Sequence, residues 1–373
     1  MSGKLISAAM IVRNEERFLE GCLESLRSVV DEVVVVDTGS SDTSKDIALS
    51  YGARVFDFPW NGSFADARNE AIGRSEGRWI LYIDADERFV SGGRAAVEAE
   101  LSRPGYAAHT VKFHPITGYT SYREYRIFLN DPRIRFEGVI HESMVAGMND
   151  AAEEDGLAIG DSPFSIIHTG YDGELTHKHE RNLPLLIKQI ENDPERMYLR
   201  WQLGVAMKGL GDARGAERAW TEALRMTRAK DISNVTHEDS HVYYEMICLL
   251  AERGGDIGPL LEEALSLFPD NYLFIWTRAR ALVREGRFEE AAPVFESLLS
   301  IDPDTLTGPL AYNAGIFGEL SHEPLAGCYF KLGRLAESEA HYARALGLDP
   351  DNTEYKTKLM FVRAMLGRAK ATS

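Results

Sequence analysis

Two carboxylates stand directly after a short apolar run, and their spacing suggests a cation site. Trp79–Ile83 is followed by Asp84, Ala85 and Asp86. Such a run is typical of a buried strand, whose carboxyl end is where open α/β sheets bind ligands. Two anions about 6 Å apart on an extended chain repel each other unless a cation is near. Mg²⁺ or Mn²⁺ would suit them and leave positions for substrate phosphates. On this stretch alone, an acidic turn capped by Asp86 explains the residues equally well.

The elements that would carry these carboxylates alternate in type along the chain. Apolar runs of strand length are separated by stretches in which apolar residues recur every three or four positions, as on one helix face. The expected strands are Leu5–Val12, Val33–Val36, Arg54–Phe58 and Trp79–Asp84, and the expected helices between them begin near Phe18, Thr43 and Phe64. This order predicts a doubly wound, mostly parallel sheet of the nucleotide-binding type.

Polar residues follow several of these strands at the same edge of the predicted sheet. Asn14 and Glu15 follow the first strand, Asp37 follows the second, and Asp84 and Asp86 follow the fourth. The carboxyl ends of parallel strands share one crevice, so these residues should converge there. Their convergence favours a metal–nucleotide site over a capping turn. No G-x-G-x-x-G follows the first strand and no P-loop pattern is present, which disfavours a dinucleotide dehydrogenase and a P-loop enzyme.

Four motifs, in this order and spacing, resemble those of GT-A, family 2 glycosyltransferases. They are Arg13-Asn14-Glu15, Val36–Asp42, Phe64–Asn69 and Asp84–Asp86. The resemblance implies a GT-A fold, which is a Rossmann-like α/β domain. It also implies a nucleotide-sugar donor, a divalent metal held through the D-x-D motif, and usually inversion at the anomeric carbon.

The sequence is also similar to the peptide S-glycosyltransferases of the glycocin bacteriocins, of the sublancin type, over about its first 200 residues. The shared motifs are Phe-x-x-Ala-Arg-Asn (from Phe64), Arg126-Ile127-Phe128, Phe136–Glu142, His168–Tyr171, and a stretch with Lys178, Arg181, Asn182, Leu185 and Leu186. This resemblance favours a peptide acceptor.

We expect Asp86 to be a metal ligand, because a carboxylate there can reach a cation that bridges two phosphates. Asp84 would face the ribose hydroxyls or a metal-bound water. His168 follows a short apolar strand, and an imidazole suits Mn²⁺ better than Mg²⁺. The resemblance places the family's C-terminal metal-binding histidine at His168. A partly buried histidine at a strand end, with its hydrogen bonds satisfied, is the structural alternative.

An inverting transfer needs a group that takes a proton from the acceptor nucleophile. The resemblance places the family's catalytic acidic residue at Glu142, and His141 is the second candidate. Glu142 could instead make a local cap or ion pair. If the acceptor were a cysteine thiol, the base would matter less, because a thiol ionises near its ordinary pKa of about 8.5.

The remaining candidates concern the nucleotide. Asp37 is expected to contact the uracil or ribose, with Arg13 and Glu15 near the base. Arg68 and Asn69 are expected near the nucleotide and its phosphates, where a fixed cation balances leaving-group charge. The structural alternatives are a helix cap for Asp37 and a surface ion pair for Arg68.

Three aromatic or basic side chains could belong either to the site or to the core. Arg126 would contact the diphosphate or only pair with Glu124, and the sequence does not favour either. Trp60 and Tyr82 are expected to pack in the core.

Composition limits the possible partners. The 373-residue chain carries a formal net charge of −17, which opposes general binding to nucleic acid or to an anionic membrane surface. No apolar run reaches 18 residues and no signal peptide is evident. Cys22, Cys248 and Cys328 are far apart and should be buried thiols. We therefore expect a cytoplasmic protein.

Beyond Gly173 the strand pattern ends and a helical repeat begins. Pro269 and Pro303 are 34 residues apart, the length of a tetratricopeptide repeat (TPR). Small residues and aromatics recur at the template positions, including Gly204, Ala279 and Phe295. Asp304–Gly318 is an insertion, which in repeat arrays maps to a loop on one face. The predicted domains are therefore a GT-A domain at 1–175 and an all-α TPR-like domain at 176–373, which binds the acceptor, dimerises, or does both.

The sequence predicts a metal-dependent inverting hexosyltransferase that uses a UDP-sugar and Mn²⁺ or Mg²⁺. The acceptor would be a Cys or Ser/Thr side chain of a polypeptide. One alternative is the same reaction on a glycan, lipid or nucleobase. In that case the TPR array would serve to form a homodimer. The other alternative is a TPR scaffold with a catalytically silent transferase domain.

Overall fold

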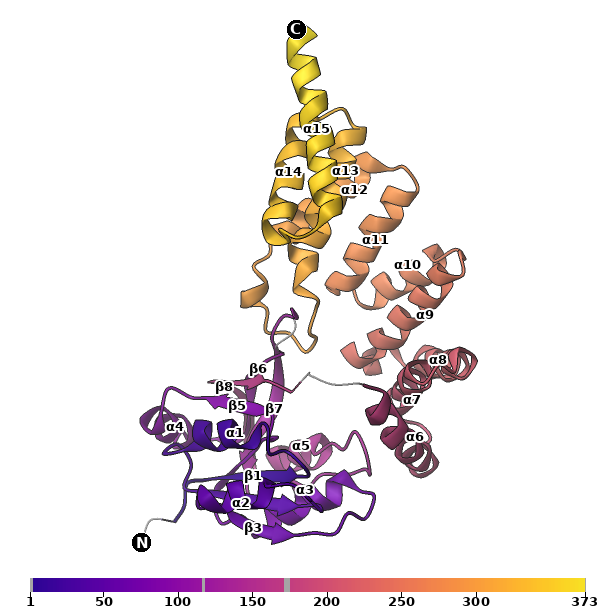
Figure 1. Ribbon diagram of the computed structural model, residues 1–373. Coiled ribbons are helices and arrows are strands. Elements are labelled where there is room, and N and C mark those ends of the chain that lie inside the picture. Colours follow the sequence, from indigo (N-terminus) through magenta and orange to yellow (C-terminus); the bar gives the residue numbers. More distant parts are fainter. Residues whose placement is uncertain (1–2, 116–117, 171–174, 373) are drawn as a thin grey trace. The chain divides into compact units, whose positions relative to one another are not determined.

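The computed structural model describes residues 3–115, 118–170 and 175–372 (Figure 1). Tyr171, the last residue of the His168–Tyr171 motif, falls outside these residues. The chain divides into two compact units. Unit 1 comprises 1–117, 121–222 and 307–309, and unit 2 comprises 118–120, 223–306 and 310–373.

Unit 1 is built on one eight-stranded mixed sheet with the order β3-β2-β1-β4-β7-β6-β8-β5. Its strands are β1 (Ile6–Val12), β2 (Glu32–Asp37), β3 (Arg54–Asp57), β4 (Trp79–Tyr82), β5 (Glu87–Val90), β6 (Tyr106–His114), β7 (Tyr122–Leu129) and β8 (Ala158–His168). The first four are mutually parallel, as predicted. β7 pairs antiparallel with β4 and β6, β8 is parallel to β6, and β5 is antiparallel to β8.

Helices cover both faces of this sheet. They are α1 (Leu19–Leu26), α2 (Ser44–Ser50), α3 (Phe64–Arg74), α4 (Arg94–Leu101) and α5 (Val145–Glu154). Side chains alternate along β1, so Met10 packs with residues of α1, α2 and α4, and Ala9 packs with residues of α3 and α5. Two apolar cores therefore sandwich the parallel strands, and the strand ends remain open for a site.

Three further helices follow the sheet: α6 (Leu175–Asn192), α7 (Met197–Gly209) and α8 (Ala213–Arg228). α6 and α7 pack against the segment after β7, where Leu186 and Leu199 bury Ile140. Gln189 fixes the same segment, since its Oε1 accepts a hydrogen bond from the Val139 amide at 2.8 Å. α6 is thereby held next to the segment that carries His141 and Glu142. α6, α7 and α8 as far as residue 222 group with the sheet, and the functional boundary at 175/176 stays a prediction.

Unit 2 consists of paired helices. They are α9 (Ser240–Glu252), α10 (Gly258–Leu267), α11 (Tyr272–Arg284), α12 (Phe288–Leu299), α13 (Glu319–Lys331), α14 (Leu335–Leu348) and α15 (Thr353–Thr372). The small residues Ala279 and Ala291 and the aromatic Phe295 are fully buried between α11 and α12, as the repeat template requires. Two short 3₁₀-helices, Pro303–Thr305 and Ala314–Phe317, occupy the predicted insertion. The expected fold class, a GT-A-type α/β domain followed by TPR-like helices, is confirmed.

Within the described residues, no helix is long and apolar enough to cross a membrane.

Candidate active site

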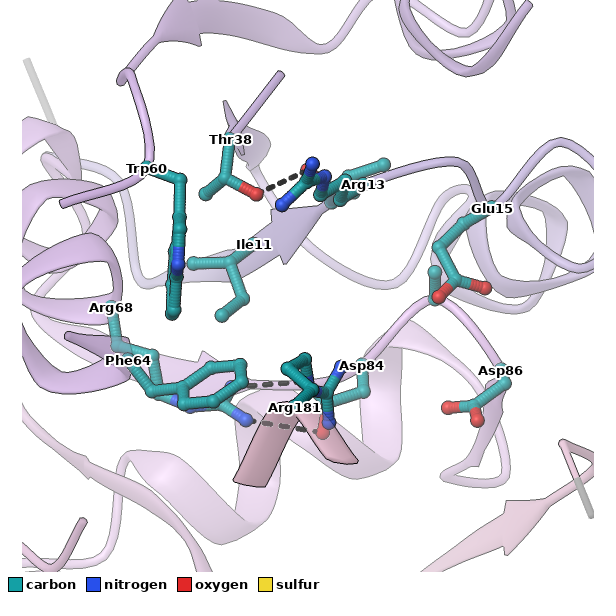
Figure 2. Close-up of a pocket in the computed structure, with 12 residues that line it drawn as sticks. Ile11, Arg13, Glu15, Thr38, Trp60, Phe64, Arg68, Asp84, Asp86 and Arg181 are labelled. Carbon is teal, nitrogen blue, oxygen red and sulfur yellow. Dashed lines mark hydrogen bonds and ion pairs between the residues drawn. The ribbon is translucent and has the colours of Figure 1, made fainter. Parts of the chain in front are cut away.

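The turn after β4 places both predicted carboxylates at the carboxyl end of the parallel strands. Asp84 and Asp86 are partly exposed, and both line one cavity of about 260 Å³. The Cys22 thiol helps to fix the backbone of this turn, because it donates a hydrogen bond to the Asp84 carbonyl at 3.4 Å. The two side chains thus face a common space, as the sequence predicted (Figure 2).

Arg68 connects Asp84 to the segment after β7. Its Nη1 and Nη2 donate to the two Asp84 carboxylate oxygens at 2.8 and 3.2 Å, and its Nε donates to Glu142 Oε1 at 2.7 Å. Arg68 comes from the second turn of α3, which Ser63 caps by accepting from the Asp66 amide. Coulombic attraction to Asp84 and Glu142 outweighs burial and keeps the pKa of Arg68 far above its ordinary value. One fixed cation therefore joins two candidate functional carboxylates.

The turns after β1 and β2 form the next part of the site. Asn14 adopts a left-handed backbone (φ 57°), its amide donates to Ser40 Oγ, and its Oδ1 accepts from the Ser41 amide at 2.8 Å. Asp37 is 3% exposed, and its carboxylate accepts from the amides of Gly39 and Ser40. These contacts hold the turn after β2 and are not a helix cap, because α2 begins at Ser44 with Thr43 at its N-cap position. Asp37 does not itself line the cavity. Its neighbour Thr38 does line it.

Arg13 and Glu15 also line the cavity. Burial, together with the negative charges of Asp86, Asp84 and Asp42, raises the pKa of Glu15 to about 7. The carboxylates of Glu15, Asp84 and Asp86 consequently share the cavity, and a bound cation would relieve their mutual repulsion.

His168 ends β8 beside Asp86, with Nε2 3.1 Å from Oδ2. Burial alone would lower the pKa of His168, but the hydrogen bond and charge of Asp86, with Glu87 and Asp84, raise it. A carboxylate oxygen and an imidazole nitrogen at this separation fit two ligands of one cation such as Mn²⁺. The described residues contain no group of three or more His, Cys, Asp or Glu suited to a metal. Remaining ligands would have to be phosphate oxygens or water, which fits a cation that binds with a nucleotide.

The two candidates for the general base differ in their surroundings. The Glu142 side chain is 11% exposed and points to Arg68. His141 has a left-handed backbone (φ 50°), and its ring contacts Tyr198 edge-on. Burial, with the charges of Arg196 and Lys178, lowers the pKa of His141 to about 4. The conjugate acid of the His141 imidazole is therefore about as strong as an ordinary carboxylic acid, so basicity does not separate the two candidates, and the assignment of the base to Glu142 stays a prediction.

Asn69 and Arg126 lie outside the residues that line the cavity. Asn69 Nδ2 donates to the Phe136 carbonyl and its Oδ1 accepts from the Phe136 amide, both at 2.8 Å. Arg126 is 5% exposed and donates to both Glu124 and Glu87. The pairing with Glu124 was one of the two sequence alternatives, whereas the pairing with Glu87 was not foreseen. Roles of Asn69 and Arg126 in nucleotide binding stay predictions.

Seven residues that line the cavity were not among the sequence candidates, and Trp60, Phe64 and Arg181 have the largest side chains of these. Trp60, which we expected to pack in the core, lines the cavity and contacts Phe64 edge-on at 4.8 Å. Figure 2 shows both rings on the side of the cavity opposite Glu15 and Asp86. Arg181 reaches the cavity from α6, with its guanidinium over the Phe64 ring at 5.3 Å. The one sequence signal for Arg181 was the stretch shared with the sublancin-type enzymes.

Arg181 and Arg13 are close enough to affect each other. Burial and the positive charge of Arg13 lower the pKa of Arg181. Two guanidinium groups that repel each other at the rim of a cavity form a favourable place for an anion such as a phosphate.

Comparison with known proteins finds relatives of both the N-terminal and the C-terminal part of the chain. Residues 7–143 match glycosyltransferase family 2, and residues 250–308 and 325–352 match tetratricopeptide repeats. The chain is 32% identical over 270 residues to the TPR repeat-containing protein Synpcc7942_0270 of Synechococcus elongatus, an alignment that covers 69% of this chain and 64% of that protein. It is 25% identical over 206 residues to the SPbeta prophage-derived glycosyltransferase SunS of Bacillus subtilis, covering 51% and 46%.

Among solved structures, S. aureus TarS aligns with a TM-score of 0.38 and 16% identity, covering 68% of this chain and 53% of that chain. The chain spans 64% or less of the length of these curated relatives. The N-terminal part is a glycosyltransferase family 2 domain, as its motifs predicted, and tetratricopeptide repeats follow it. The expected resemblance to the sublancin-type enzymes is confirmed by the SunS match.

Proposed function

We propose that this protein is a metal-dependent, inverting glycosyltransferase that moves a sugar from a UDP-sugar to a Cys or Ser/Thr side chain of a polypeptide. The single observation that carries the proposal is the Asp84–Arg68–Glu142 chain of ion pairs at the edge of the cavity. It joins the acidic turn, where the family 2 resemblance puts the donor, to the candidate base.

In the proposed reaction the acceptor sulfur or oxygen attacks the anomeric carbon of the sugar. The new bond forms on the face opposite the bond between the anomeric carbon and the UDP phosphate oxygen. That bond breaks, and UDP leaves with its electron pair. Glu142 takes the acceptor proton. Arg68 lies between Glu142 and Asp84 and provides positive charge beside the developing charge on the diphosphate.

Asp86 and His168 would hold a divalent cation, which when bound supplies positive charge that stabilises the leaving diphosphate. Arg13 and Arg181 would add two guanidinium groups at the rim. Trp60, Phe64 and Thr38 would supply the uncharged part of the wall. A UDP-sugar has both a flat base and a charged diphosphate, so this mixture of groups suits it.

A polypeptide acceptor is supported by the tetratricopeptide repeats, whose concave surfaces bind extended or helical segments. The motif resemblance to peptide S-glycosyltransferases supports it independently. An ordinary thiol acceptor would need less help from Glu142 than a hydroxyl, because the thiol ionises much more readily.

The proposal is tested by screening UDP-sugars for Mn²⁺-dependent UDP release, alone and with Cys- or Ser-containing peptides analysed by mass spectrometry. Glu142→Gln should lower turnover by roughly 10²- to 10⁴-fold, the usual contribution of a general base. His141→Gln should lower it much less. Asp57, an exposed carboxylate paired with Lys45, gives the matched control Asp57→Asn, which should leave turnover unchanged.

Turnover that is insensitive to Glu142→Gln but lost in His141→Gln would reverse the assignment of the base. Sugar transfer to a glycan or lipid, with no peptide modified by any donor, would exclude the polypeptide acceptor. Absence of UDP release with every UDP-sugar would contradict the proposed donor.

A further inference from the structure

A buried ion pair lies directly behind the acidic turn. Arg126 Nη2 donates to Glu87 Oε1 at 2.8 Å, and Nη1 donates to Glu87 Oε2 at 3.1 Å. Glu87 is 1% exposed and Arg126 is 5% exposed. A bidentate pair of this kind fixes both side chains, and breaking it leaves a buried charge uncompensated.

Glu87 also holds the backbone of the turn. The Asp84 amide donates to Glu87 Oε2 at 2.9 Å, so this carboxylate oxygen serves Arg126 and the turn together. Glu87 begins β5 and lies opposite His168 in the β5–β8 ladder. One residue further on, the amide and hydroxyl of Thr169 both donate to the Asp86 carbonyl at 2.7 Å. Glu87 therefore binds the Asp84 backbone, follows Asp86 in the chain and pairs with His168 in the ladder.

Arg126 has its other contacts away from the cavity. Its Nε donates to Glu124 at 2.7 Å, and its guanidinium lies 4.4 Å from the centre of the Tyr82 ring. Tyr82 has the Arg68 guanidinium at 5.3 Å as well. Attraction to Glu87, followed by Tyr82, Glu124 and Asp84, outweighs burial and raises the pKa of Arg126 well above its ordinary value. The guanidinium is thus a permanent charge that is engaged by protein groups.

We propose that Glu87 and Arg126 are positioning residues that fix the Asp84–Asp86 turn and His168 for binding of the cation and nucleotide. The inference rests on the proposed function and deepens it. Glutamine offers one acceptor oxygen where Glu87 uses two, so Glu87→Gln loses either the bidentate contact to Arg126 or the contact to the Asp84 amide, and it loosens the turn that carries Asp86 beside His168. Loss of partners that orient ligands in this way costs roughly 10- to 100-fold in metal affinity.

The test measures Mn²⁺ affinity in the presence of UDP, from the electron paramagnetic resonance signal of free Mn²⁺. No turnover is needed. Glu87→Gln should weaken Mn²⁺ binding by roughly 10- to 100-fold. Glu124→Gln removes a carboxylate from the same arginine without touching the turn, so it should stay within about twofold of the wild-type protein. Circular dichroism establishes that each variant is folded.

If Glu87→Gln does not fold, Arg126→Lys serves instead, because it keeps the positive charge but loses the bidentate geometry. A folded variant with unchanged Mn²⁺ affinity would overturn the inference and leave the pair with a purely structural role. Equal losses in Glu87→Gln and Glu124→Gln would also overturn it. Absence of Mn²⁺–UDP binding in the wild-type protein would instead contradict the proposed function, and the inference would fail with it.

Discussion

Arg68 and Glu142 are 74 positions apart in the sequence, yet Arg68 Nε lies 2.7 Å from Glu142 Oε1. The opposite edge of the same guanidinium binds Asp84. Glu142 follows β7 whereas Asp84 follows β4, and these strands are antiparallel neighbours in the sheet. The planar guanidinium can serve two carboxylates at once, a geometry that lysine cannot reproduce.

Arg68→Lys should therefore lower kcat/KM for sugar transfer by at least about 10²-fold, as the loss of a fixed charge-stabilising donor usually does. The measurement is steady-state UDP release with a saturating acceptor. Arg74→Lys is the matched control, because Arg74 lies on the same helix, pairs with half-buried Glu70 and does not line the cavity. It should retain activity within about twofold. Comparable losses in both variants would point to damage to α3 instead of a role for Arg68 in the site.

Glu15 gives a prediction about pH. Its pKa is about 7 in the folded protein, against an ordinary 4.5. Between these values the folded state retains a proton that the unfolded state has lost, so stability falls as pH rises through this window. Without metal, Glu15→Gln should raise Tm at pH 8 by about 2–4 °C, equal to roughly 1 kcal/mol, after discounting for the exposed part of Glu15.

The gain from Glu15→Gln should disappear at pH 4, where the wild-type carboxyl is protonated in both states. Differential scanning fluorimetry in EDTA measures both values. A Tm difference that is the same at the two pH values would show that the substitution acts through packing and not through the charge of Glu15.

The residues of the acidic turn could be predicted because their signal is local. The run Trp79–Ile83 defines a strand, and the residues after a parallel strand must lie at the ligand-binding edge. Arg126 was harder. Alternation along β7 places it in a buried strand, but its partner Glu87 is on β5, which lies at the far edge of the sheet beside β8. That strand order depends on long-range pairing, which sequence periodicity does not report.

Arg181 and Trp60 could not be assigned from the sequence for a similar reason. Leu185 and Leu186 predict only that α6 has an apolar face, and the position of Arg181 depends on which surface that face covers. In the structure it covers Ile140, Val139 and Phe64. Asn69 belongs to a family motif and was expected near the nucleotide. In the structure both ends of its side-chain amide are hydrogen-bonded to the Phe136 backbone.

Arg181 provides a test of the rim of the cavity. Arg181→Gln should weaken UDP binding by about tenfold, the equivalent of one hydrogen bond to a charged group. Lys188→Gln on the same helix is the control, since Lys188 is exposed and does not line the cavity. Isothermal titration calorimetry gives both dissociation constants. If the two substitutions had equal effects, the loss would reflect net charge and not contact with the donor.

Gly204 tests the packing of α7 against α8. A Cβ at Gly204 would collide with the Trp220 indole, which is 1% exposed and held by a hydrogen bond to the Trp201 carbonyl at 3.1 Å. Gly204→Ala should cost about 1–3 kcal/mol in the free energy of unfolding. Gly73→Ala on α3 meets no atom within 4 Å and should be neutral or stabilise by up to about 1 kcal/mol. Urea denaturation compares them, and an equal effect would contradict close packing at Gly204.

The measurement that tests the proposed donor site most directly is calorimetric titration of UDP with and without Mn²⁺, for the wild-type protein and Asp86→Ala. The wild-type protein should bind UDP at least about tenfold more tightly with Mn²⁺. Asp86→Ala should remove this dependence while circular dichroism shows a folded protein. UDP affinity that does not change with Mn²⁺, or a dependence that survives in Asp86→Ala, would contradict a metal–nucleotide site at the end of β4.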